Sequence, residues 1–302
     1  MWAPGYRLSA YGYRLFDFST RLAVSLFTLS LSRLKRKVVA MRGMLGALVG
    51  AVLLSSMAMA AVGAQVGTPE SGSPVAGTSN VAGLVDLGDG RRLYLECRDK
   101  GSPTVILEAG AGNTAASWDS GELPPGSRQT AVRPGVAAFI RVCAYDRLGA
   151  VNESGGARSD PASGPRDARA MVSDLHALRQ GAAIPGPYVL VGHSFGGLVI
   201  RLNAATYPDE VAGLVLIDAA HEDYYAAVQD VLTPEQWAAF APRPDATDAE
   251  VAIEWIDIDA SAREMREEMA ASPLRPMPLI VLTHGLPWSW PEGSPVDALE
   301  AV

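Results

Sequence analysis

The feature that most constrains the fold is residues 188–197, with the sequence YVLVGHSFGG. The apolar residues that open it, rich in β-branched types, predict a short buried strand. Glycines then bracket Ser194, and the apolar periodicity of residues 198–205 predicts a helix. A chain that passes from strand to helix through so tight a turn holds its central residue in a strained conformation, and the glycines let strand and helix approach closely.

This arrangement points to nucleophilic chemistry at Ser194. The hydroxyl would stand at the start of a helix, where the helix dipole favours developing negative charge. The pattern Gly192-x-Ser194-x-Gly196 also occurs in ordinary glycine-rich turns, so the flanking strand and helix support the interpretation as a nucleophile elbow. With that context, the chain from about Val81 to about Leu282 resembles the α/β-hydrolase superfamily, in particular its secreted bacterial serine hydrolases of the esterase type.

The resemblance implies an α/β fold with a mostly parallel central sheet, flanking helices and a small helical lid. We expect this domain to occupy residues 81–302, with the amphipathic segment at about 222–273 as the lid. The other expected elements are a hairpin over 82–97, strands over 103–108, 139–145, 213–221 and 277–284, and a helix over 166–179.

The resemblance also implies an oxyanion hole. Members of the superfamily place a glycine-containing loop after the strand that corresponds to 103–108, and one backbone N–H of this loop enters the hole. Carried over to this sequence, the donors are the N–H of Ala111 and the N–H of Phe195, next to the nucleophile. Asp146 lies in a Tyr-Asp-Arg-x-Gly turn whose role in the superfamily is mostly structural, so we do not expect it to be catalytic.

A serine nucleophile needs a base to take its proton and an acid to orient that base. In the superfamily the order is serine, acid, histidine, and the acid follows the sixth or seventh strand. Asp218 follows the sixth strand and is the predicted acid, although capping of the strand end would also explain it. After the seventh strand, Glu292 and Asp297 are further acidic residues.

None of the four histidines stands at the superfamily's base position, which follows an eighth strand. His176 is expected on a helix, and the side chain of His193 is expected to point away from the neighbouring nucleophile. His221 and His284 could lie near the mouth of the pocket and act as a substitute base. The simpler expectation is that the superfamily's last strand, histidine loop and last helix are missing, so that the chain is truncated and inactive as it stands.

Residues 1–64 are predicted to be an N-terminal extension followed by a signal peptide. From Met41 the chain has a basic start, an apolar middle and an A-x-A-like end, with cleavage after Ala60 or Ala64. An uncleaved membrane anchor over residues 43–64 is the alternative. Translation that starts at Met41, or an unusually long basic region, would explain the residues before it.

Residues 65–80, rich in Gly, Ser, Pro and Thr, are predicted to be a flexible linker. The chain has 25 basic and 33 acidic residues, and eight of the former and one of the latter precede Gln65. The 17 basic and 32 acidic residues that remain give the rest a net charge of −15, which argues against nucleic acid and anionic membranes as partners. A membrane contact is expected only through the N-terminal segment.

Cys97 and Cys143 are the two cysteines of the chain. In an exported protein an even pair favours a disulfide, and two buried thiols are the alternative. The superfamily's strand order implies the same pairing, because it makes the second and fourth strands neighbours, and neighbouring strands lie within disulfide range.

These observations predict a secreted serine hydrolase that acts on a small-molecule ester or related acyl compound. No metal-ligand spacing, phosphate loop or dinucleotide fingerprint occurs in the sequence, so no cofactor is expected. Relatives that use an aspartate nucleophile are disfavoured by Ser194, whereas cofactor-free haloperoxidase chemistry stays open. The alternative is a non-catalytic protein of the same fold that binds a ligand or partner under its lid.

Overall fold

The computed structural model describes residues 80–119, 130–152, 154–240 and 254–283. The predicted N-terminal extension, signal peptide or anchor, and nearly all of the linker lie outside the described residues. So do His284, Glu292 and Asp297. Within the described ranges, no helix is long and apolar enough to cross a membrane.

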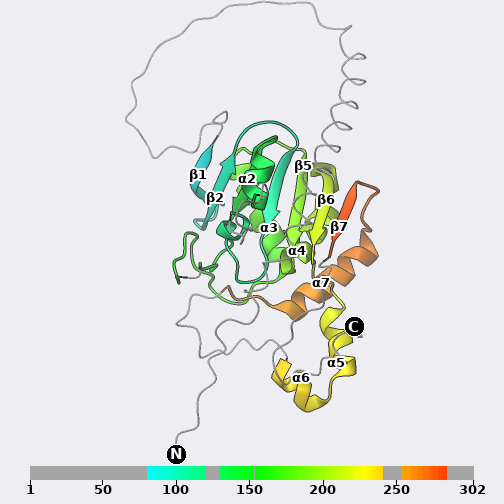
Figure 1. Cartoon of the computed structure of the whole chain (residues 1–302). Coiled ribbons are helices and arrows are strands. Elements are labelled where there is room, and N and C mark those ends of the chain that lie inside the picture. The colour runs from blue at the N-terminus through cyan, green and yellow to red at the C-terminus, as the bar shows by residue number, and fades with distance from the viewer. Residues whose placement is uncertain (1–79, 120–129, 153, 241–253, 284–302) are drawn as a thin grey trace, which may run out of the picture.

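A mixed sheet forms the centre of the fold, with the strand order β1-β2-β4-β3-β5-β6-β7 (Figure 1). Strand β2 pairs antiparallel with β1 and β4, and all the other neighbours are parallel. The sheet is therefore mostly parallel, as predicted. The strands are β1 Val81–Asp86, β2 Arg92–Arg98, β3 Thr104–Glu108, β4 Val142–Tyr145, β5 Tyr188–His193, β6 Val211–Ile217 and β7 Leu279–Leu282.

Helices cover both faces of this sheet. Helices α3 and α4 pack on one face, and α2 with the 3-10 helix η1 packs on the other. The helices are α2 Val132–Ala137, α3 Ala168–Gly181, α4 Phe195–Thr206, α5 Tyr224–Val231, α6 Pro234–Phe240 and α7 Ile258–Ala271, with η1 Ala115–Trp118 and η2 Pro208–Glu210. Figure 1 shows α5 and α6 standing apart from the sheet.

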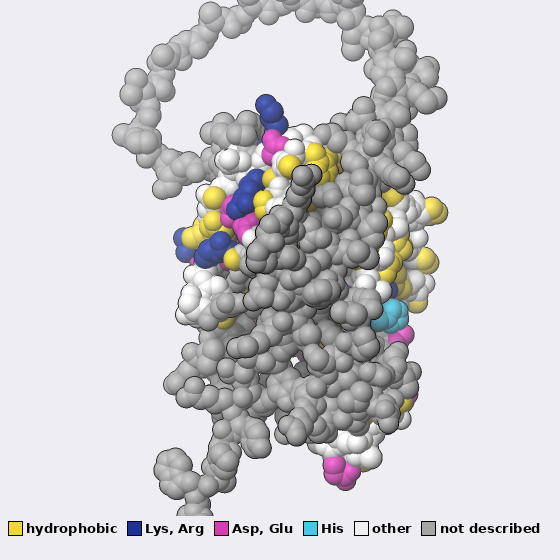
Figure 2. All heavy atoms as spheres, viewed as in Figure 1, with side chains coloured by type: hydrophobic (Ala, Val, Ile, Leu, Met, Phe, Trp, Pro, Cys, Tyr) yellow, Lys and Arg dark blue, Asp and Glu magenta, His cyan; other side chains and the backbone are white. Residues whose placement is uncertain are grey.

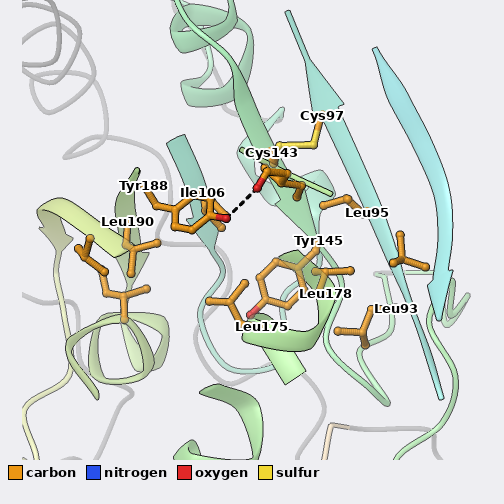
Figure 3. Close-up of a cluster of buried hydrophobic side chains, with 14 of the residues drawn as sticks. Leu93, Leu95, Cys97, Ile106, Cys143, Tyr145, Leu175, Leu178, Tyr188 and Leu190 are labelled. Carbon is orange, nitrogen blue, oxygen red and sulfur yellow. Dashed lines mark hydrogen bonds between the residues drawn. A yellow bond between two sulfur atoms is a disulfide. The ribbon is translucent and has the colours of Figure 1, made fainter. Parts of the chain in front are cut away.

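The inner strands are buried on both faces, which explains why they are nearly continuous apolar runs. In β3, Ile106 packs towards α3 and α4, whereas Val105 and Leu107 pack towards α2. Leu190 of β5 joins Ile106, and Tyr145 of β4 lies in the same cluster (Figure 3). The strands that lead to the site are thus fixed by packing from both sides.

The predicted strands are all present, but their bounds differ, for example in the strand expected over 139–145. It begins only at Val142, because the preceding residues complete the end of α2, a helix that the sequence did not predict. The N–H of Phe139 and the N–H of Ile140 both donate to the carbonyl of Val136. Pro134, near the helix start, is tolerated because the first-turn N–H groups have no acceptor within the helix.

The segment predicted as a lid contains α5, α6 and α7. Val228 of α5 and Trp237 of α6 share a small cluster of their own. Helix α7 instead packs against α3 and α4, and Met265 on it is fully buried beside Leu202. Within this segment, α7 is therefore part of the helical layer that covers the sheet.

The predicted disulfide is present. Cys97 on β2 and Cys143 on β4 are directly opposite in the antiparallel register, with their Cα atoms 4.0 Å apart (Figure 3). Both are buried in the cluster that includes Leu95 and Tyr145. The bridge therefore joins the antiparallel part of the sheet to its parallel part.

Strand β7 is the last strand of the sheet within the described residues. Leu279 and Val281 are 53% and 58% exposed, although both are large apolar residues. Figure 2 shows apolar side chains along the margin where Figure 1 places β7. The unpaired backbone groups of an apolar edge strand of this kind can pair with another strand.

Candidate active site

Ser194 occupies the turn between β5 and α4 with φ of 50° and ψ of −125°. A positive φ is unfavourable for a residue with a side chain and persists only where the surroundings enforce it. Here the N–H of Ser194 donates to the carbonyl of Ile217 over 3.1 Å, and its own carbonyl accepts from Gly197 and Ala220, each over 2.9 Å. Three backbone hydrogen bonds thus hold the strained residue between β5, α4 and the end of β6.

The glycines around Ser194 are required by close backbone approach. A Cβ atom on Gly192 would lie 2.5 Å from the carbonyl oxygen of Gly196, and one on Gly196 would lie 2.5 Å from the carbonyl oxygen of Ala109. At Gly197 the obstacle would be the Cβ atom of Ala219, at 2.3 Å. Any side chain at these three positions would force the elbow to open.

The loop over residues 109–113 lies directly beside the elbow. A Cβ atom on Gly110 would be 3.3 Å from Ser194 Cβ and 2.9 Å from His193 Nδ1. Ala111 packs against the cluster that contains Phe195. The structure therefore brings the two predicted oxyanion residues and the predicted nucleophile to one place.

The N–H of Phe195 belongs to the first turn of α4. The first N–H groups of a helix have no acceptor within the helix, and their partial positive charge favours an anion. A developing oxyanion next to Ser194 would meet this end of α4. The arrangement is the one expected for acyl transfer.

Asp218 follows β6 directly, with φ of 41°, and its N–H donates to the carbonyl of Leu282 over 2.8 Å. In the β5–β6 register His193 is paired with Ile217, so Asp218 and His193 lie at the same edge of the sheet. Burial lowers the pKa of His193, and the negative charge of Asp218 partly opposes that shift. The predicted acid is therefore close enough to influence an imidazole beside the nucleophile.

The other described histidines lie elsewhere. His176 on α3 stacks on Tyr207, with ring centroids 4.0 Å apart, and its Nδ1 is 3.4 Å from a carboxylate oxygen of Glu210. His221 is 59% exposed, and its Nδ1 accepts the N–H of Asp223 over 3.2 Å. Both rings have partners within their own surroundings.

A buried ionic cluster contacts the loop over residues 109–113. It is made of Glu108, Arg147 and Glu254 with Tyr145. Arg147 is paired with both carboxylates, and the Tyr145 hydroxyl donates to Glu108. Arg147 also donates to the carbonyl of Ala109 over 2.6 Å and to the carbonyl of Gly110 over 2.7 Å. The cluster thus connects the ends of β3 and β4 with the segment before α7.

Burial is the main influence on the ionisation of this cluster. It raises the pKa of Glu108, and the Arg147 charge and the Tyr145 hydroxyl only partly oppose this. Burial also acts to lower the pKa of Arg147, but Glu254 and Glu108 outweigh it and hold that pKa well above its usual value. The guanidinium therefore stays charged.

Sequence reasoning missed three residues of this region. Arg147 was covered only by the expectation that its turn is structural, and Glu254 was one of many acids in the predicted lid. Asn113 was recognised only as a loop residue, yet its side-chain nitrogen is buried with no hydrogen-bond partner among the described residues and would lie 3.3 Å from a Cβ atom on Gly110. The one sequence feature that could have indicated this cluster was Glu108, an acidic residue at the end of the mostly apolar strand β3.

The sequence profile of the alpha/beta hydrolase fold family matches residues 103–262, more than half of the chain. The chain belongs to this family. The match includes β3, the loop 109–113, the elbow at Ser194 and the end of β6 at Asp218.

Several curated proteins are similar to parts of this hydrolase-fold chain. A lipase of Mycobacterium tuberculosis, LipV, is 39% identical over 121 residues, which are 37% of this chain and 44% of the lipase. A protein described as a probable transporter, efuK of Hormonema carpetanum, is 29% identical over 170 residues, 55% of this chain and 22% of that protein. The chain spans less than half the length of these relatives.

Solved structures with a similar fold include mouse alpha/beta hydrolase domain-containing protein 10. It is 16% identical, with a TM-score of 0.48, and the alignment covers 67% of this chain and 77% of that one. A thermophilic esterase of Thermogutta terrifontis is 18% identical, with a TM-score of 0.38, over 68% of this chain and 92% of the esterase.

Proposed function

We propose that this protein is a serine hydrolase that cleaves carboxylic esters, with Ser194 as the nucleophile. The observation that carries the proposal is the strained turn at Ser194, held between β5 and α4 beside the loop 109–113. Strain of this kind, enforced by surrounding backbone, is concentrated at functional sites. The similarity of one segment to a lipase supports an ester as the substrate.

In the proposed reaction Ser194 Oγ attacks the acyl carbon, and the carbonyl oxygen becomes an oxyanion. The N–H groups of Ala111 and Phe195 stabilise this oxyanion by several kcal/mol, of the order found for such donors. The base that took the serine proton gives it to the departing alcohol, and water then releases the acid from the acyl-serine and restores the serine hydroxyl. Asp218 is proposed to orient the histidine that takes the serine proton.

The test is covalent labelling by a fluorophosphonate of the protein expressed from its complete reading frame. We expect a phosphonate adduct on Ser194, located by peptide mass spectrometry, and hydrolysis of p-nitrophenyl acetate at a rate well above the uncatalysed one. The matched control is Ser194→Ala, which should lose both signals and keep its fold. A wild-type protein that stays unlabelled would sink the proposal.

The same measurement decides between candidate bases. His193→Gln, His221→Gln and His284→Gln are compared for labelling rate, and the variant that loses labelling identifies the histidine that activates Ser194. If all three keep the wild-type rate, the base lies outside this set. His176→Gln serves as the control, because His176 is stacked on Tyr207.

A second candidate is a non-catalytic protein of the same fold that binds a small ligand. The specific observation in its favour is that His176 and His221 have other partners, as described above. This candidate predicts no turnover by the wild type and equal ligand binding by the wild type and by Ser194→Ala.

We also propose that the protein is exported, with a signal peptide that ends at Ala60 or Ala64. The Cys97–Cys143 bridge supports export, because disulfides persist in oxidising compartments. Mass spectrometry of the protein recovered outside the cytoplasm should show an N-terminus at residue 61 or 65. Recovery only in membranes, with the leader intact, would favour an anchor over residues 43–64 instead.

A further inference from the structure

We propose that Arg147, held by Glu108 and Glu254, is the positioning residue that aims the oxyanion donor of the loop 109–113. The inference rests on the proposed serine hydrolase function and gives a specific role to Arg147, whose turn was expected to be only structural. It follows from the hydrogen bonds of a single guanidinium group.

All five N–H donors of Arg147 can be matched to acceptors. The Nε group donates to Glu254, and Nη1 donates to Glu108 and to the carbonyl of Ala109. The Nη2 group donates to the carbonyl of Gly110 and, over 2.8 Å, to Glu254. A fully matched fork fixes the guanidinium plane, and with it the two carbonyls that it holds.

The orientation of those carbonyls sets the orientation of the following N–H groups. In a planar trans peptide, the C=O of one residue and the N–H of the next point in opposite directions. Because the carbonyl of Gly110 is turned towards Arg147, the N–H of Ala111 points away from Arg147. Rotation of this one peptide would remove the Ala111 donor from its place.

Glu254 fixes the next residue of the loop as well. One carboxylate oxygen of Glu254 accepts the N–H of Gly112 over 3.0 Å while it also binds Arg147. The N–H of Asn113 donates to the carbonyl of Gly110 over 3.2 Å. The loop N–H groups at 112 and 113 are therefore held by partners within the protein.

The burial of the cluster argues that it is maintained for a purpose other than stability. Glu108 and Glu254 have completely buried side chains, and that of Arg147 is 4% exposed. Burial of such charges costs about as much free energy as their attraction returns, so an apolar replacement would often be as stable. Geometric control of the loop is a function that apolar side chains could not perform.

The test uses two conservative variants of the full chain, Arg147→Lys and Glu254→Gln. Lysine keeps the charge but has three donors on a flexible stem, so it cannot hold both carbonyls and both carboxylates. We expect kcat for p-nitrophenyl acetate to fall about 100-fold in Arg147→Lys and about 10-fold in Glu254→Gln, as for loss or displacement of an oxyanion donor. KM should change less than about threefold, because the ground-state ester makes little use of the donor.

A second readout separates positioning from general loss of structure. A trifluoromethyl ketone forms a tetrahedral oxyanion on the serine, so its inhibition constant should rise in parallel with the fall in kcat. Inhibition by the corresponding alcohol, which forms no oxyanion, should stay within threefold of the wild-type value.

The matched control is Arg201→Lys, which breaks a bidentate pair with Glu222 whose two hydrogen bonds are 2.7 and 3.0 Å long. This variant should keep wild-type kcat. If Arg147→Lys does not fold, Glu254→Gln decides the question. The inference is wrong if the folded variants keep kcat and ketone inhibition within threefold of the control. A wild type without Ser194-dependent labelling overturns the proposed function, and the inference with it.

Discussion

Strand β5, an inner strand of the sheet, and strand β7, the edge strand among the described residues, are both short and apolar, but their surroundings differ. Five of the six residues of β5 are buried, whereas every residue of β7 is at least partly exposed. Strand β5 ends in a strained serine and a set of glycines that tolerate no side chain. The comparison teaches that the strained turn is placed where both faces of the sheet are covered and the backbone cannot relax.

The strongest test of this difference is Gly192→Ala. The added Cβ atom would lie 2.5 Å from the carbonyl oxygen of Gly196, so strand and helix must separate. We expect the free energy of unfolding, measured by urea denaturation, to fall by about 3 kcal/mol. The matched control is Gly164→Ala, which meets no atom within 4 Å and should change stability by less than about 0.5 kcal/mol. Equal effects at the two positions would contradict the close approach.

Loss of the disulfide is expected to have an effect of similar size. Cys97 and Cys143 close a loop with a sequence separation of 46 between β2 and β4. Replacing both by alanine should reduce the free energy of unfolding by about 2–4 kcal/mol. Thermal unfolding with and without a reductant provides the measurement. A wild-type protein whose melting temperature does not respond to reduction would contradict the bridge.

A matched pair of substitutions compares the two strands directly. Valine and threonine have nearly the same shape, so Val191→Thr and Val281→Thr differ only in where a hydroxyl is placed. Val191 is fully buried and Val281 is 58% exposed. We expect a loss of about 1–3 kcal/mol for Val191→Thr and a change below about 0.5 kcal/mol for Val281→Thr. Similar losses would show that β7 is covered in solution.

The smallest expected effect is a pH dependence at the end of β5. Burial lowers the pKa of His193 below its usual value of 6.5. The unfolded chain therefore binds more protons than the folded one once the pH falls below about 6.5, and stability decreases as the pH is lowered further. His193→Gln should flatten this part of the profile, measured by urea denaturation between pH 5 and 8. An unchanged slope would mean that other groups cause it.

The strands and the elbow could be predicted because their signals are local. Short apolar runs bounded by glycine and proline indicated β3, β5, β6 and β7, and the glycines around Ser194 indicated the turn. Helix α2 was missed because Pro134 and Gly135 interrupt the helical pattern. The contact of Arg147 with Glu254 spans 107 residues, and no local pattern carries information over that distance.

The backbone of Ser194 has a consequence for how this protein could be improved. A residue with positive φ is one that glycine would occupy more comfortably, so Ser194→Gly should relieve strain while it deletes the only hydroxyl at the elbow. Selection for heat resistance alone would therefore favour loss of the proposed nucleophile at this position. Stability and the proposed activity therefore make opposite demands on the residue at position 194. A screen for more stable variants must also measure activity.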